Sequence, residues 1–112
     1  MSIVAKALIN SKFAGTAITT EYTVPVGTRT IIDKFTVTNS SGSNESVTIY
    51  LVPSGSSALS SNMLIKARTI NAAAIDDLTQ LQNQILAAGD TIQVVSSNSS
   101  AIVIRASGRE IT

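Results

Sequence analysis

The sequence predicts an all-β fold, an antiparallel β-sandwich or jelly roll of about seven or eight strands. The first observation is that short segments with alternating apolar and polar residues recur roughly every ten residues, with turn-forming residues between them. The second is that Thr, Val and Ile, which suit pleated and half-covered sheets, are frequent. The third is size: 112 residues with 44% hydrophobic content indicate one domain, residues 1–112, with a mainly aliphatic core.

The first expected strand covers residues 2–9, and both of its faces are mostly apolar. Lys6 is its only charged residue. Because an edge strand is normally protected by charge, two interpretations remain open. The strand pairs inside its own sandwich, or it is an arm that pairs with a second copy or another protein by strand addition. The candidate partner interface consists of Ser2, Ile3, Val4, Ala5, Lys6, Ala7 and Leu8.

A second strand is expected at about residues 16–24, and a long hairpin follows it. The hairpin joins strands at 31–39 and 47–51 through a polar loop whose Asn, Ser and Gly residues tolerate turn conformations. Strict alternation in the first hairpin strand places these residues on one face: Ile31, Asp33, Phe35, Val37 and Asn39. We therefore expect Phe35 and Val37 to point into the core.

The segment 71–86 has two interpretations. Its composition favours a helix, and four aliphatic residues are spaced as one helical face: Ile75, Leu78, Leu81 and Ile85. In an all-β protein, the same residues fit a short strand at about 74–78 followed by a helical turn within 79–84. The strands expected on either side, at 63–70 and 91–96, favour the second interpretation.

The remaining segments are turns, one more strand and the tail. Residues 56–62 are predicted to form an exposed loop by their Ser content. A tight turn at 87–90 places Gly89 where a positive φ is needed. The last clear strand is expected at 101–107, and the tail, 108–112, either extends it or leaves the domain.

The sequence lacks the usual catalytic constellations. It contains no His and no Cys, which removes the common nucleophile–base pairs and the commonest metal ligands. Asp76 and Asp77 are the only acidic pair, and adjacent residues of a strand point to opposite faces, so they would not converge as a carboxylate dyad. A calcium site formed with Asp90 is the one metal alternative, against the simpler interpretation of a solvated loop edge. We therefore expect no enzymatic activity, cofactor or bound metal.

Nucleic acids and membranes are not expected partners, because the net charge is only +1. A basic face would require one set of residues on neighbouring strands: Lys34, Lys66, Arg68, Arg105 and Arg109. Asp33 and Glu110 interrupt this set, and aromatic stacking partners are scarce. No apolar run approaches the roughly 20 residues of a membrane span, and the N-terminus lacks the pattern of a signal peptide.

Four turn-rich motifs carry a family resemblance: YTVPVG at 22–27, IIDKFTVTN at 31–39, VTIYLVPSG at 47–55 and LAAGDTI at 86–92. The motifs resemble those of small jelly-roll structural proteins of tailed bacteriophage virions, and the resemblance covers about residues 22–107. The motifs are structural turns, not catalytic signatures. The resemblance implies a jelly-roll-like domain in a virion.

Proteins of this kind decorate or cement the capsid exterior, or belong to the tail and its fibres. The resemblance implies a cement protein, made in the host cytoplasm and located on the capsid exterior, that staples neighbouring major capsid subunits. A dimer on a two-fold axis would suit such a staple, because one self-complementary patch suffices. The alternative is a tail- or fibre-associated module that binds a host surface glycan or protein. The small size and the lack of coiled-coil heptads favour the first role.

Overall fold

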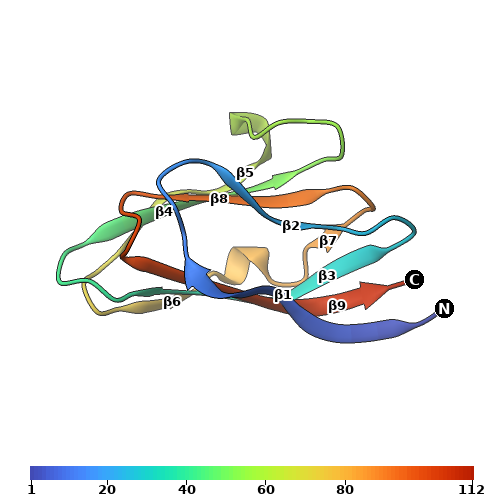
Figure 1. Cartoon of the computed structure of the whole chain (residues 1–112), viewed down its shortest axis with the longest axis horizontal. Helices are drawn as coiled ribbons and strands as arrows, with labels where there is room; N and C mark the ends of the chain where they lie inside the picture. Colours follow the sequence, from blue (N-terminus) through green and yellow to red (C-terminus); the bar gives the residue numbers. More distant parts are fainter.

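A computed structural model describes residues 1–112 as two antiparallel β-sheets packed face to face (Figure 1). The terminal sheet, which holds both chain ends, contains β1 (Ile3–Phe13), β9 (Ile102–Ile111), β3 (Arg29–Asn39), β6 (Ile75–Asp77) and β7 (Ile85–Leu86). The opposite sheet contains β2 (Thr19–Thr23), β8 (Thr91–Ser96), β4 (Glu45–Val52) and β5 (Met63–Ile70). Two 3₁₀ turns, η1 (Ser60–Asn62) and η2 (Thr79–Leu81), complete the chain.

The strand order is that of a jelly roll, as the sequence predicts. The chain forms one long hairpin, in which β1 pairs with β9, β2 with β8, β3 with β6 and β7, and β4 with β5. Rolling this hairpin adds two pairings, β3 with β9 and β4 with β8. The result is the pair of sheet orders β1-β9-β3-β6 and β2-β8-β4-β5.

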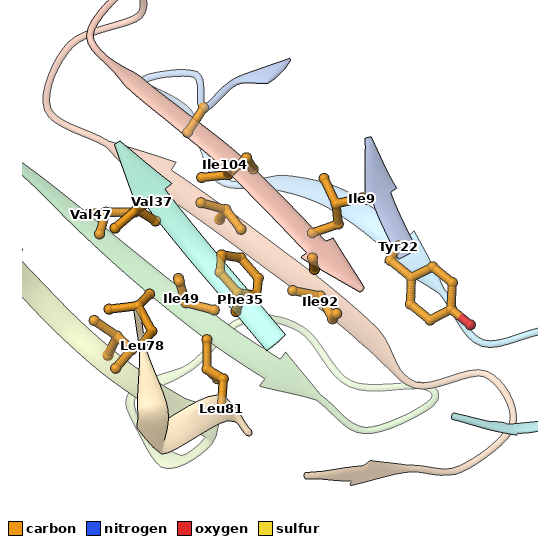
Figure 2. Close-up of a cluster of buried hydrophobic side chains, with 14 of the residues drawn as sticks. Ile9, Tyr22, Phe35, Val37, Val47, Ile49, Leu78, Leu81, Ile92 and Ile104 are labelled. Carbon is orange, nitrogen blue, oxygen red and sulfur yellow. The ribbon is translucent and has the colours of Figure 1, made fainter. Parts of the chain in front are cut away.

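The segment 71–86 follows the strand-and-turn interpretation, and the helical alternative is wrong. β6, η2 and β7 lie in succession along the same side of β3. Leu78 and Leu81 are fully buried at η2 (Figure 2), so the apolar spacing that suggests a helix instead anchors a single 3₁₀ turn in the core. This interruption divides one strand position into two short strands, which explains why the structure has nine strands.

The core fills the space between the sheets and is almost entirely aliphatic. Phe35 and Val37 of β3 are fully buried, as expected, and they lie among side chains of the opposite sheet such as Ile49 and Ile92 (Figure 2). Full burial of side chains of this size contributes roughly 1.5–3 kcal/mol each. The structure contains no helix that is both long and apolar enough to cross a membrane.

A β-bulge in β3 corrects the predicted face of its first half. Ile32 lies opposite Gly108 and Lys34 opposite Ser107, so Asp33 is an extra residue on β3. The bulge reverses the alternation, and Ile32 is buried while Asp33 points outward. Strict alternation therefore fails before the bulge and holds after it. The bulge lies beside η2, where the neighbouring segment leaves regular pairing: Leu78 N–H donates to the Phe35 carbonyl, and Asn83 N–H donates to that of Ile32.

The polar loop between β3 and β4 is held by one buried amide. The Asn39 side chain donates to the carbonyl oxygens of Ser43 (2.8 Å) and Ile70 (2.9 Å). Its own oxygen accepts a hydrogen bond from the backbone N–H of Ser41 at 2.9 Å. A fully buried amide is tolerated here because its donors and its acceptor are all paired. The loop is thereby fixed onto both sheets.

Candidate interaction surface

The acidic side chains are occupied in structural contacts. Of the seven carboxylates, five form ion pairs: Lys6–Glu110, Lys12–Glu21, Lys34–Asp77, Arg68–Asp76 and Arg109–Asp33. Glu45 accepts hydrogen bonds from Ser97, Asn98 and Ser43, which lower its pKa. Asp90 accepts the backbone N–H groups of Ser54 and Ala87 and holds the turn before β8. Each carboxylate therefore has a contact that explains its position.

The structure does not bring together the three residues of the calcium alternative. Asp76 and Asp77 lie on β6, where they bind Arg68 at 2.8 Å and Lys34 at 3.6 Å. Asp90 is held in its own turn, and no three acidic side chains form a group that could enclose a metal ion. A shallow depression of about 190 Å³ adjoins Asp76, but it is lined by residues 69–71 and 74–76 and contains no nucleophile with a base.

The basic residues of the sequence set are divided between the sheets. Lys34, Arg105 and Arg109 belong to the terminal sheet, and Lys66 and Arg68 belong to β5 of the opposite sheet. Ion pairs with acidic residues hold Lys34, Arg68 and Arg109. The sequence set therefore does not form one basic face.

An open surface lies where the two chain ends run side by side (Figure 1). We call it the terminal extension: residues 2–7 paired with residues 107–112. Every residue from Met1 to Lys6 is exposed. Ile3 and Val4 point to opposite faces, yet they are 55% and 52% exposed, so neither face of this strand is fully covered by the rest of the chain. Residues 3–7 thus form a regular, mostly apolar edge strand that pairs only with β9 and stays mostly exposed. Natural proteins usually protect such an edge.

The inner side of the terminal extension is tied to the opposite sheet by a polar network. Tyr22 of β2 donates its hydroxyl hydrogen to Glu110 at 2.6 Å and lies 2.7 Å from the hydroxyl of Thr30. Lys6 lies 3.5 Å from the other carboxylate oxygen of Glu110. Burial, followed by the hydrogen bond to Glu110, raises the pKa of Tyr22 to about 12. The network fixes the position of the extension and leaves its outer side free.

Gly108 sets how closely the strands of the extension approach one another. It lies on β9 between Lys6 of β1 and Ile32 of β3. A β-carbon at this position would collide with the carbonyl oxygen of Ile31 and would lie 2.8 Å from Leu8 Cδ1. The bulge of β3 therefore packs directly against the glycine backbone, and no larger residue fits without a shift of β3.

One edge of the terminal extension has unpaired backbone groups. Ser2 and Thr112 exchange both of their N–H···O hydrogen bonds, at 3.3 and 2.9 Å. Because hydrogen-bonding direction alternates along an antiparallel pair, the backbone N–H and C=O groups of Val4 and Lys6 also point toward β9. The N–H and C=O groups of Ile3, Ala5 and Ala7 therefore point away from the sheet. The side chains beside them are mostly small and apolar, and a second strand could reach these groups.

The other sheet edges are protected. β2 has five residues and a register shift, and β6 and β7 have only three and two residues. β5 is irregular, with two register shifts against β4 and Ala67 at φ 44°. β1 itself carries two register shifts after Ala7 and ends near the Lys12–Glu21 ion pair. Bulges, short strands and charge are the usual protections of an edge. Residues 3–7 contain no bulge and belong to a long strand, and Lys6 is their only charged residue.

The structure places the predicted interface residues on this surface, with one exception. Residues 2–7 are part of the terminal extension, and they pair with β9 inside the same molecule. Leu8 is instead 6% exposed, because the first bulge of β1 turns both Leu8 and Ile9 into the core. Sequence reasoning missed Glu110, Gly108 and Ile111, which lie beside this strand only because β9 continues to Ile111. The expected tail is thus part of the last strand.

The fold and this surface together define a jelly-roll protein with an open, regular sheet edge. The chain matches no known protein-family profile, and no curated protein is similar to it in sequence. Several solved chains share its fold, among them the following two. One is described as "Bacillus endospore appendages form a novel family of disulfide-linked pili", with 11% identity, a TM-score of 0.57, and coverage of 99% of this chain and 88% of that chain.

The second is described as "Structure of infectious bursal disease virus Gx strain". It has 12% identity and a TM-score of 0.53, and the similarity covers 97% of this chain and 32% of that chain. The present chain therefore spans about a third of the viral chain that it resembles. At these identities the likeness concerns the jelly-roll fold alone.

Proposed function

We propose that this chain is a structural protein of a tailed-bacteriophage virion, which decorates the outside of the capsid and staples neighbouring major capsid subunits. The observation that carries the proposal is the terminal extension, where Ile3, Ala5 and Ala7 offer backbone groups to a second protein. Binding there needs no catalytic residue, cofactor or metal, and the proposal includes none. The turn motifs that resemble phage virion proteins give the biological setting, and the jelly-roll fold agrees with it.

The remaining surface also suits a staple. Because five ion pairs lie within the molecule and the net charge is +1, binding would depend mainly on backbone hydrogen bonds and apolar contact. Self-association belongs to the same proposal, since a staple on a two-fold axis needs only one self-complementary patch. The protein would be made in the host cytoplasm and incorporated on the capsid exterior.

A tail- or fibre-associated role is the second candidate. One observation favours it: the similarity to the pilus structure extends over nearly all of both chains. Those pili are disulfide-linked, whereas the present chain has no Cys. In any fibre that includes this chain, its contacts with neighbouring subunits would therefore have to be non-covalent or use other chemistry than disulfides.

Locating the protein on intact particles separates these roles. Antibodies raised against the purified chain would be applied, for immuno-electron microscopy, to particles released from cells that carry this sequence. We expect labelling over the capsid surface. Labelling restricted to the tail would support the second candidate, and particles without any label would overturn both.

The role of the terminal extension can be tested on the same particles. Ile3→Asp adds a charge to the open surface, and Val26→Asp adds the same charge at a loop residue that is 99% exposed. We expect Ile3→Asp to lose retention on particles after mild heating, whereas Val26→Asp is retained like the original chain. Equal retention of both variants would show that the terminal extension is not the binding surface.

A further inference from the structure

We propose that two copies of this chain pair through the free edge of β1, with a two-fold axis at Ala5. The two terminal sheets then join into one continuous sheet across the axis. This inference rests on the proposed structural role and names its first partner, a second copy. It is tested on the purified protein, without any particle.

The regular part of β1 has the length and symmetry that such pairing needs. Its register with β9 is unbroken from Ile3 to Ala7, and the first bulge begins immediately afterwards. Ala5 is the centre of this five-residue run, so a two-fold axis there uses all of it. Ile3 then lies opposite Ala7 of the second copy, and Ala5 lies opposite Ala5. All three are hydrogen-bonded positions, because their N–H and C=O groups are the ones that face outward.

The neighbouring registers are less favourable. An axis at Lys6 would place the two Lys6 side chains directly opposite each other, where like charges repel. An axis at Val4 would pair Ile3 with Ala5 and would leave Ala7 beyond the regular strand of the second copy. With the axis at Ala5, each Lys6 lies opposite Val4 and keeps its own Glu110 at 3.5 Å. Charge and hydrogen bonding thus select the same register.

The same edge also selects a closed dimer over a chain of subunits. Head-to-tail growth would need a second long and regular edge, but β2, β5, β6 and β7 are short or irregular. The only regular edge available to residues 3–7 is therefore the same edge of another copy. Pairing of one patch with itself closes after two subunits.

The side chains agree with this arrangement. Ile3, Ala5 and Ala7 share the outer face of the terminal sheet, where Ile3 lies beside Ile111 in the register. In the dimer each Ile3 lies next to Ala7 of the second copy, so a half-exposed isoleucine gains an apolar neighbour without steric conflict. Val4, which is 52% exposed on the inner face, is covered by the stem of the second Lys6.

Disulfide trapping tests the register, because the chain contains no Cys of its own. In this register the two Ala5 Cα atoms lie about 5.5 Å apart, within the range that a disulfide spans. We expect Ala5→Cys to form a reducible dimer under mild oxidation. Val26→Cys, at a fully exposed loop residue, is the control for random collisions and should stay monomeric.

A mixing experiment makes the test specific. In this register Val4 of one copy lies opposite Lys6 of the other, with their Cα atoms about 4.5 Å apart, so the variants to mix are Val4→Cys and Lys6→Cys. A mixture of the two variants should therefore cross-link readily. In a dimer of Val4→Cys alone, the two cysteines would be diagonal neighbours with Cα atoms roughly 7–8 Å apart, too far to form a disulfide readily. Cross-linking of Val4→Cys alone, or equal cross-linking of all pairs, would overturn the register.

Solution mass tests the pairing itself. By sedimentation equilibrium, we expect the unmodified chain to approach twice its monomer mass as its concentration rises. Ala5→Pro removes an outward N–H that has no partner inside the molecule, and it should remain monomeric with the fold intact by circular dichroism. Val26→Lys, which adds charge away from the edge, should dimerise normally, whereas Ala5→Lys should not.

The outcomes separate this inference from the proposed function. A chain that remains monomeric at all concentrations, without an Ala5→Cys cross-link, would overturn the two-fold pairing. If such a monomeric chain still labels the capsid surface, the proposed function stands, and the partner of the β1 edge would be a capsid subunit. A dimer with the expected cross-links, but without any labelling of particles, would support the pairing and overturn the virion role.

Discussion

Phe35 and Thr36 are adjacent on β3 and report which of its faces is buried. Phe35 is fully buried between the sheets, and Thr36 lies on the outer face of the terminal sheet, where its hydroxyl is 3.4 Å from Asp77. We expect Phe35→Ala to lower the free energy of unfolding by about 3–5 kcal/mol, and Thr36→Ala to lower it by about 0.5 kcal/mol or less. Urea titration of both variants measures the difference. Equal losses would contradict the assignment of faces.

Tyr22 gives the protein a pH dependence at its alkaline limit. The pKa of its phenol is raised from 10.0 to about 12, first by burial and then by the hydrogen bond to Glu110. Below the unfolded value of 10.0 both the folded and the unfolded chain keep the phenol proton, so the contribution of Tyr22 to stability is fully present and does not change with pH. Between the two values only the unfolded chain loses the proton, so the free energy of unfolding falls as pH rises.

Two measurements check this prediction for Tyr22. In a Tyr50→Phe variant, Tyr22 is the only tyrosine, and its phenolate absorbance should appear at about pH 12 and not at 10.0. The stability of a Tyr22→Phe variant should then fall less steeply than that of the original chain in this pH range. Ionisation of Tyr22 near pH 10 in the folded protein would contradict both the burial of its side chain and its hydrogen bond to Glu110.

At the scale of elements, Gly108 decides whether β1, β9 and β3 can lie at their observed separation. Gly108→Ala places a methyl group against the Ile31 carbonyl, which cannot move without disturbing the bulge of β3. We expect a loss of about 1–3 kcal/mol in the free energy of unfolding. Gly42→Ala is the control, because no atom lies within 4 Å of its added β-carbon. A similar effect of the two substitutions in thermal unfolding would contradict the close approach at Gly108.

The elements also show how far sequence reasoning reaches. Period-two alternation located β3, β4, β8 and β9, because the side-chain period of a strand depends only on local geometry. It failed at Asp33 and at Leu8, where a bulge inserts one residue and reverses the faces. A bulge depends on the neighbouring strand, which is distant in sequence. For residues 71–86 the strands expected on either side, and not the helix propensity of the segment, favoured the correct interpretation, a short strand and the turn η2.

At the scale of the whole molecule, the sequence predicted the jelly roll and only part of the open surface. Residues 2–7 were recognisable as an apolar strand with little charge. Their neighbours were not, since Tyr22 and Glu110 are separated by 88 positions and meet only after the hairpin is rolled. The pairing of β1 with β9 likewise joins the two ends of the chain. Contacts of this range follow from topology and have no local signature.

The whole-molecule charge distribution predicts how association responds to salt. The net charge is +1, five ion pairs lie within the chain, and the proposed dimer places Lys6 opposite Val4 and not opposite a charge. Ions screen exposed charges over about 10 Å at 0.1 M salt, but they have little effect on backbone hydrogen bonds or apolar contact. We therefore expect the dimer dissociation constant to change less than about threefold between low and high salt, a difference below about 0.7 kcal/mol.

Sedimentation equilibrium at several salt concentrations measures this response. Lys6→Gln serves as the control, because it removes the only charged residue of the paired run 3–7 and should leave the weak salt response unchanged. Steep dissociation of the original dimer by salt, abolished in Lys6→Gln, would instead show that Lys6 forms an ion pair across the axis. The most direct candidate for its partner would be Glu110 of the second copy, which lies next to Val4 in the register with β9. That result would keep the axis at Ala5, because in this register Lys6 lies opposite Val4, the neighbour of Glu110, and it would contradict only the expected weak response to salt.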